Sequence, residues 1–177
     1  MGSARRLFLA LWPGDELRQT LAQATRRAVR ASGGRPVRVE NLHLTLFFLG
    51  ATTPDQERCL VQALAAMPPL PGFTLRLDHF GCFPRARVLW LAPREVPQPA
   101  LALGLELNRR AGACAFRAEP RPFRPHLTLA RKVAHGADGA LEPPLLWRVH
   151  DFCLVESKTY PDGPCYQVRQ RWPLATG

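Results

Sequence analysis

The tetrapeptide His-Leu-Thr-Leu occurs twice in this chain of 177 residues, at 43–46 and at 126–129, and no other feature constrains the fold as much. Each copy lies in an apolar, β-prone run, where successive side chains alternate between the two faces of a strand. Each histidine therefore shares a face with the threonine two residues later, while the leucines face the other way and can anchor in a core. The repeat, with copies 83 residues apart, predicts two similar strands that each carry half of one site.

A pair of histidines with neighbouring threonines suits phosphoryl chemistry. A neutral imidazole takes a proton from an attacking hydroxyl or water, and a protonated one delivers a proton to the leaving oxygen. We expect His43 and His126 to be the catalytic pair, and their near-identical settings leave open which is base and which is acid. Thr45 and Thr128 are expected to bind the substrate by donating hydroxyl hydrogen bonds to phosphate oxygens.

Two further residues near the motifs are candidates for substrate binding. Strict alternation places Arg131 on the face opposite His126, but a twist or bulge at the strand end would turn it toward the site. Phe47 shares the face of His43 and Thr45, where it would either stack on a ribose or base or belong to the core.

The charge of the chain favours an anionic partner. The formal net charge is +10, and 22 of the 24 basic residues are arginines, with Lys132 and Lys158 as the two lysines. Arginine presents a planar fork of donors that matches phosphate, although an arginine-rich proteome would also explain its preference over lysine. We expect a polyanion as the partner.

Cysteine usage and hydropathy indicate the cellular setting. Five widely spaced cysteines form no Cys-x-x-Cys pair, which favours reduced thiols in a cytosol over a zinc ribbon or a redox motif. The short apolar run that ends at Leu11 is too short for a signal peptide, and no segment approaches the length of a membrane span. We therefore expect a cytoplasmic monomer that makes no contact with a membrane.

Apolar periodicity and turn residues predict a mixed α+β fold with antiparallel sheet. Three helices are expected. The first begins at Pro13-Gly14-Asp15 and ends at the glycines at 33–34, and the second covers about 54–67 and starts with a capping box at Thr53. The third covers about 99–111. Strands are expected within 6–11, 37–48, 73–80, 87–92, 116–130, 147–156 and 166–172, with a loop at 135–144. No linker divides the chain, so residues 1–177 are expected to form a single domain of two similar lobes.

The motifs and their flanks resemble the RNA 2′,3′-cyclic phosphodiesterase family, also called 2′-5′ RNA ligases, of the two-histidine phosphoesterase superfamily. The similar stretches run through almost the whole chain: 6–10, 41–50, 81–85, 88–91, 121–131, 156–157 and 163–166. The resemblance implies two pseudo-symmetric lobes with antiparallel sheets around a central groove and helices on the outside. It also implies opening of a 2′,3′-cyclic phosphate at an RNA end to a 2′-phosphomonoester, with no cofactor and no metal, and a phosphate-binding role for the arginine at 131.

Three other functions compete with hydrolysis. The same groups would run the reverse reaction, which joins the cyclic phosphate to a 5′-hydroxyl in a 2′-5′ linkage, although water at about 55 M favours hydrolysis. A non-catalytic RNA-binding module would not need both motifs intact. A zinc hydrolase would need a third protein ligand, and the sequence shows neither a His-Glu-x-x-His motif nor a carboxylate near the histidines.

Overall fold

The computed structural model describes residues 3–176, which form three α-helices and nine strands. The helices are α1 (Asp15–Ala31), α2 (Pro54–Ala65) and α3 (Gln98–Ala113), with one 3₁₀ turn, η1 (Val39–Asn41). The strands are β1 (Arg5–Leu11), β2 (Arg35–Pro36), β3 (Leu44–Thr52), β4 (Phe73–Phe83), β5 (Val88–Ala92), β6 (Leu127–Arg131), β7 (Gly139–Val149), β8 (Asp151–Tyr160) and β9 (Gly163–Pro173). Every pair of named strands is antiparallel, which confirms the predicted α+β class.

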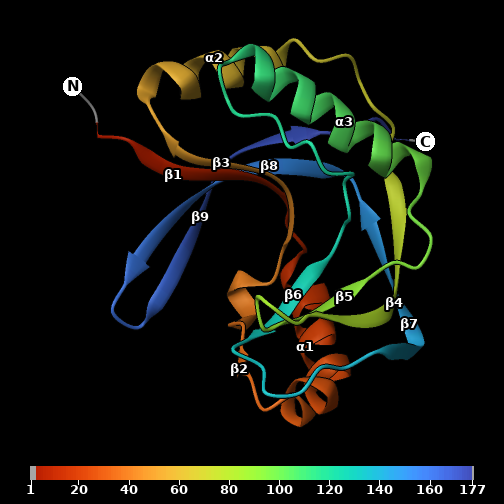
Figure 1. Cartoon of the computed structure of the whole chain (residues 1–177). Helices are drawn as coiled ribbons and strands as arrows, with labels where there is room; N and C mark the ends of the chain where they lie inside the picture. The colour runs from red at the N-terminus through yellow and green to blue at the C-terminus, as the bar shows by residue number, and fades with distance from the viewer. Residues whose placement is uncertain (1–2, 177) are drawn as a thin grey trace.

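The sheet consists of two halves that meet at one residue pair. Its order is β7-β4-β5-β6-β3-β1-β8-β9. The short strand β2 lies off this path and pairs with the end of β6, at Ala130 and Arg131. Within the described residues, the backbone pairing of β6 with β3 consists of the single pair Leu44–Leu127. Each of these leucines directly follows the histidine of its motif, so the fold brings the two motifs together at the junction between the halves (Figure 1).

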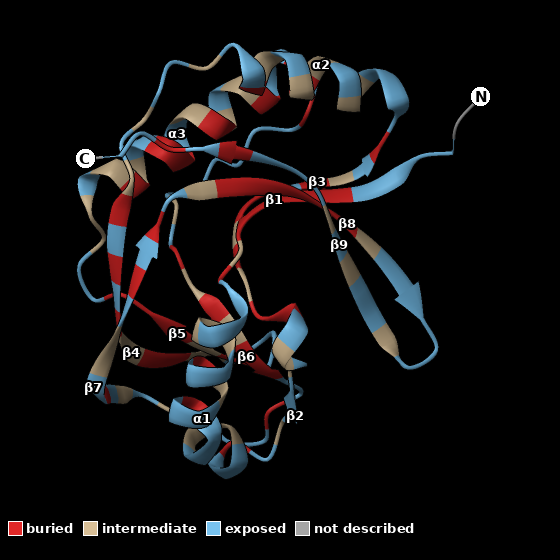
Figure 2. Cartoon of the chain, turned by 180° about the vertical axis from the view of Figure 1, so that it is seen from behind, coloured by how far each residue is buried: buried red, intermediate tan, exposed pale blue. Residues whose placement is uncertain are grey.

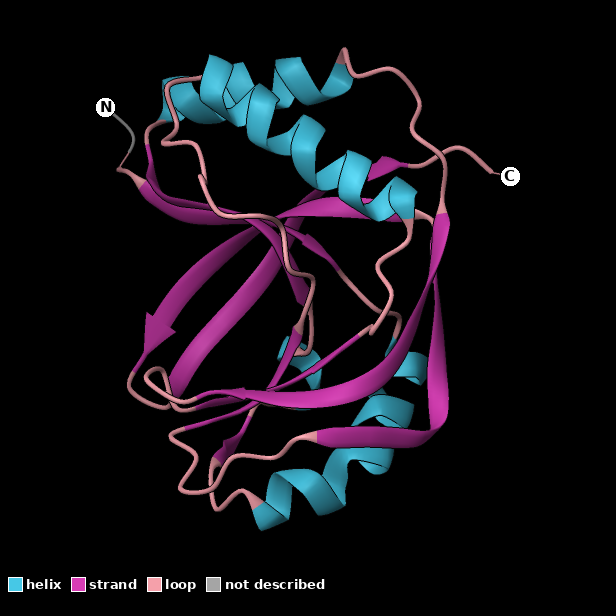
Figure 3. Ribbon diagram, turned by 45° about the vertical axis from the view of Figure 1, so that its right-hand side comes forward, coloured by secondary structure: helices cyan, strands magenta, loops and turns pink. Residues whose placement is uncertain are grey.

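The helices lie on the outside of the sheet. Figure 1 shows α2 and α3 above the half that contains β3, and α1 below the half that contains β6. The buried side chains are concentrated on the strands between these layers (Figure 2). The long strands β4 and β7 run along one side of the molecule from the α1 end to the α3 end (Figure 3).

Local sequence signals account for several element boundaries. Thr53 accepts a hydrogen bond from the Gln56 backbone N–H, and the Gln56 side chain accepts one from the Thr53 N–H, which is the predicted capping box of α2. Leu21 of α1 is fully buried, as its helical spacing predicts. The predicted strands at 116–130 are wrong for their first part, because three prolines in 120–125 deny the chain backbone donors and strand begins only at Leu127.

The loop predicted at 135–144 is also wrong, because most of it belongs to β7. Pro143 and Pro144 lie in that strand, where the pairing with β4 shifts register. A strand at the edge of a sheet tolerates proline at such an irregularity, since its outer N–H groups need no partner.

The expectation that all five thiols are reduced is contradicted by a disulfide between Cys59 and Cys114, with Cα atoms 5.7 Å apart. Cys59 lies in α2, and Cys114 directly follows α3, which packs beside α2. The sequence separation of 55 residues hid this proximity, because only the tertiary packing of the helices brings the two sulfurs together.

Candidate active site

His43 lies one residue before β3, in a setting that fixes its ring. Its Nδ1 lies 2.7 Å from the backbone oxygen of Asn41, so the neutral ring donates its Nδ1–H there and leaves Nε2 unprotonated. That Nε2 lies 3.1 Å from Oγ1 of Thr45. The Asn41 side chain donates to the backbone oxygen of Pro164 at 2.9 Å, which ties this turn to β9.

His126 has the same arrangement one residue before β6. Its Nδ1 lies 2.8 Å from the backbone oxygen of Arg124, so this ring also keeps its Nε2 free in the neutral form. In an antiparallel pair, the residues on either side of the Leu44–Leu127 pair lie opposite one another across the junction. His43 therefore lies across from Thr128, and Thr45 across from His126, all on the face opposite the two buried leucines.

Matching β-bulges re-aim the side chains that follow both motifs. On β3, Thr45 pairs with Ala10 and Phe47 with Leu9, which leaves Leu46 as the extra residue. On β6, Leu129 is the extra residue between the pairs that Thr128 and Ala130 make with β5. A bulge interrupts the alternation of faces, so the residue five positions after each histidine returns to the face of the motif.

The bulge on β3 makes Phe47 the wrong choice for a stacking residue. Phe47 is 5% exposed and belongs to the main core, whereas Phe48 is 60% exposed. The Phe48 ring lies 5.9 Å from that of Phe8, which in turn lies 4.9 Å from the His43 ring. Phe48 is therefore the exposed aromatic of β3 on the histidine face, and sequence reasoning missed it because a bulge leaves no local signal.

The equivalent bulge on β6 turns Arg131 toward the site. The charge of its guanidinium lowers the pKa of both His43 and His126. Arg131 forms no ion pair within residues 3–176, so its cation is available to an anionic ligand.

Aromatic rings surround His43. Trp12 stacks parallel to it at 5.3 Å, and the Tyr166 ring meets it edge-on at 5.2 Å. This burial is the main reason that the His43 pKa falls from 6.5 to about 4, and the charges of Arg131 and His126 lower it further against the opposing effect of the Asn41 carbonyl. His43 is therefore neutral at physiological pH.

Burial also lowers the pKa of His126, and Arg131 adds to the effect while the Arg124 carbonyl opposes it. The Phe83 ring meets His126 edge-on at 5.0 Å. In the free protein at neutral pH both rings are thus neutral, and each presents a basic Nε2.

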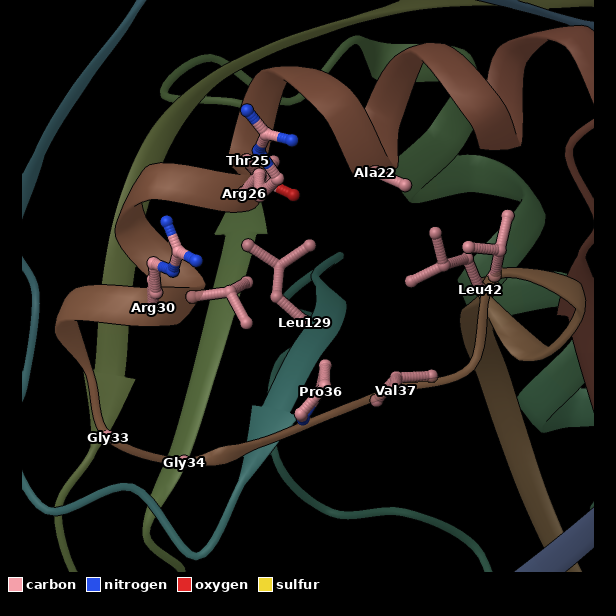
Figure 4. A pocket seen from close by; sticks show the side chains of 12 residues that line it. Ala22, Thr25, Arg26, Arg30, Gly33, Gly34, Pro36, Val37, Leu42 and Leu129 are labelled. Atoms are coloured by element: carbon pink, nitrogen blue, oxygen red, sulfur yellow. The ribbon is translucent and has the colours of Figure 1, made fainter.

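Two cavities of about 440 Å³ each flank the motifs. One opens beside His126 on the β4–β5 side of the junction. The other lies behind the strands, between α1 and the segment that contains Pro36 and Val37 (Figure 4). The lining of this second cavity contains no histidine, and the catalytic face points away from it, so we assign the chemistry to the first side.

No group of three or more side chains suited to hold a metal ion occurs in the described part of the chain. A zinc site built on His43 and His126 would therefore lack its third protein ligand. Among the same residues, no helix is long and apolar enough to cross a membrane.

Comparisons with known proteins agree with this geometry. A family described as the 2′-5′ RNA ligase superfamily matches residues 13–161. The chain is similar to the RNA 2′,3′-cyclic phosphodiesterase of Escherichia coli, with 34% identity over 98% of this chain and 99% of the relative. It is also 34% identical to the Thermus thermophilus protein of that name, over 96% of this chain and 90% of the relative. The crystal structure of Escherichia coli LigT complexed with 3′-AMP superimposes with a TM-score of 0.89 at 32% identity, covering 97% of this chain and 98% of that one.

Proposed function

We propose a mechanism from the premise that this chain belongs to the 2′-5′ RNA ligase superfamily and is a phosphoesterase of the RNA 2′,3′-cyclic phosphodiesterase type. In this mechanism, His43 and His126 hydrolyse RNA 2′,3′-cyclic phosphate ends by metal-independent acid–base catalysis. The observation that carries the proposal is the junction of β3 and β6. There, two imidazoles with carbonyl-bound Nδ1 atoms lie on one face, His43 with its Nε2 3.1 Å from Oγ1 of Thr45 and His126 two residues before Thr128.

The reaction requires one histidine neutral and the other protonated. The neutral Nε2 takes a proton from a water molecule whose oxygen attacks phosphorus. The P–O3′ bond breaks, and the protonated ring delivers its proton to the departing 3′-oxygen. The product is a 2′-phosphomonoester with a free 3′-hydroxyl, and the two histidines have exchanged protonation states.

Thr45, Thr128 and Arg131 bind the phosphate in this proposal. The threonine hydroxyls donate to non-bridging oxygens, and the guanidinium balances the charge that builds up on them in the transition state. Phe48, in place of Phe47, offers its exposed face to the base or ribose of the terminal nucleotide. The partner is RNA or an oligonucleotide with a cyclic phosphate end, and a LigT structure solved with 3′-AMP supports nucleotide binding at such a fold.

The site is made by both halves of the sheet, which supports treating residues 1–177 as a single bilobal domain. Reverse 2′-5′ ligation uses the same groups, and we include it in the proposed activity.

The test is turnover of adenosine 2′,3′-cyclic phosphate with EDTA present. Wild type is expected to produce 2′-AMP at an undiminished rate in EDTA. His43→Ala and His126→Ala are each expected to lower the rate by about 10²–10⁴, the usual contribution of a general acid or base. Zinc-restored activity after chelation, or near-normal turnover by either variant, would refute the proposal.

A further inference from the structure

The cavity beside His126 is lined by aromatic rings and arginines that the hydrolytic reaction does not use. Phe83, Trp90 and Phe123 supply its aromatic lining, and Arg94 and Arg124 its positive charge. His126 itself is part of the lining, so the cavity is continuous with the candidate active site. We call this cavity, defined by these six residues, the His126 pocket.

The shape of the His126 pocket depends on a close approach between two strands. Gly81 of β4 pairs with Trp90 of β5, and a Cβ atom at Gly81 would come within 2.1 Å of the indole. The missing side chain lets the indole lie flat on β4, with the Phe83 ring 5.6 Å away. The result is a cavity of about 440 Å³ with aromatic lining, a size and character typical of small-ligand sites.

The charge of the pocket favours an anionic ligand with an aromatic part. Neither Arg94 nor Arg124 forms an ion pair with any residue from 3 to 176. Both side chains are exposed, and Arg124 lies two residues from His126. Nucleic acid combines stacking bases with phosphates in this way.

The pocket and Phe48 lie on opposite sides of the junction. Phe48 lies on β3 near His43, whereas the pocket is built on β4 and β5 near His126. A terminal nucleoside that stacks on Phe48 leaves the pocket empty. In an in-line displacement at phosphorus, the attacking and leaving oxygens lie on opposite sides of the phosphate. A second nucleoside, attached to the attacking oxygen, would therefore extend from the phosphate into the pocket.

We propose that the His126 pocket binds the nucleoside of an RNA or oligonucleotide that presents a 5′-hydroxyl, and this proposal rests on the proposed function. The 5′-oxygen forms a bond to phosphorus, and the P–O3′ bond breaks. One histidine takes the hydroxyl proton, and the other, which is protonated, delivers its proton to the 3′-oxygen. The product is a 2′-5′ phosphodiester, and the same site cleaves that bond in reverse. The arginines bind the phosphate on the 3′ side of the acceptor nucleoside.

The experiment measures two products from adenosine 2′,3′-cyclic phosphate with increasing amounts of the dinucleotide ApA as acceptor. Hydrolysis produces 2′-AMP, and transfer produces a 2′-5′-linked trinucleotide, both separated by chromatography. For wild type we expect the ratio of transfer to hydrolysis to rise with the concentration of ApA and to reach a plateau. Bound ApA is also expected to suppress hydrolysis. Free adenosine, which lacks the phosphate, is expected to saturate only at higher concentration.

The variant Val96→Trp fills the pocket, because Val96 lines it without belonging to the catalytic groups. We expect this change to lower transfer tenfold or more while hydrolysis without acceptor stays within twofold. Val29→Trp, in the second cavity, is the matched control and should change neither. Arg124→Gln should remove most of the preference for ApA over adenosine.

The outcomes separate the two proposals. Wild type that hydrolyses the cyclic nucleotide but shows neither saturable transfer nor inhibition by ApA would overturn the pocket assignment and leave the proposed function standing. Equal transfer by Val96→Trp and wild type would overturn it as well. A wild type without any hydrolysis would instead refute the proposed function.

Discussion

The burial of His43 predicts that the stability of the protein falls on acidification by a calculable amount. Folding lowers the pKa of this imidazole from 6.5 to about 4, so the unfolded chain binds a proton over a pH range in which the folded protein does not. Proton uptake by the unfolded state destabilises the fold, and the contribution present above pH 6.5 is lost as the pH falls toward 4. One pKa unit corresponds to about 1.36 kcal/mol, which gives a loss of about 2 kcal/mol at pH 5 and about 3 kcal/mol at pH 4.

The variant that isolates this effect is His43→Asn. Its amide nitrogen still donates to the Asn41 carbonyl, as Nδ1 does, but asparagine does not titrate in this range. Urea unfolding at pH 7, 6, 5 and 4 gives the free energy of unfolding of both proteins, and the pH dependence of other groups cancels in the difference. We expect the stability of wild type relative to the variant to decline by about 2 kcal/mol between pH 7 and pH 5. Parallel curves over the whole range would refute the assigned burial of the His43 ring.

Three further outcomes are expected. The pH profile of kcat/KM for a 2′,3′-cyclic nucleotide should be bell-shaped with its optimum below pH 6.5, because both imidazole pKa values are lowered in the free enzyme; an optimum above pH 7 would contradict this. Phe48→Ala should lower kcat/KM by roughly 5- to 150-fold, which corresponds to the loss of one stacked base, and should leave the stability unchanged. Phe47→Ala should instead lower the free energy of unfolding by about 3–5 kcal/mol. Steady-state kinetics measures kcat/KM and urea titration measures the stability, and the opposite pattern would restore Phe47 as the stacking residue. Reduction of the Cys59–Cys114 disulfide, which closes a loop of 55 residues, should lower the free energy of unfolding by about 4 kcal/mol, as urea unfolding with and without dithiothreitol would show; equal midpoints would exclude this role.

The sequence was sufficient for the class of fold and the position of both histidines. A repeated motif with period-two apolar alternation depends only on local backbone geometry, which the residues themselves determine. The same reasoning failed at Phe47, because the bulge at Leu46 depends on pairing with β1, which lies far away in the chain.

The disulfide and the β7 prolines were missed for a related reason. Cys59 and Cys114 meet because α2 packs beside α3, and no local pattern encodes the contact between these helices. Pro143 and Pro144 read as loop residues in isolation, and only the position of β7 at the edge of the sheet makes them compatible with a strand.

The junction at Leu44–Leu127 places an approximate two-fold axis through the catalytic centre. A true homodimer built around such an axis would present every residue twice, so it would carry either two phenylalanines or two arginines at the position five residues after the histidine. One continuous chain is free of that constraint. In the proposed reaction it holds a cation, Arg131, on one side of the phosphate and an aromatic face, Phe48, on the other. Covalent linkage of the two halves thus lets a nearly symmetric centre accept an RNA end, whose base and phosphate are chemically unlike, in a single orientation.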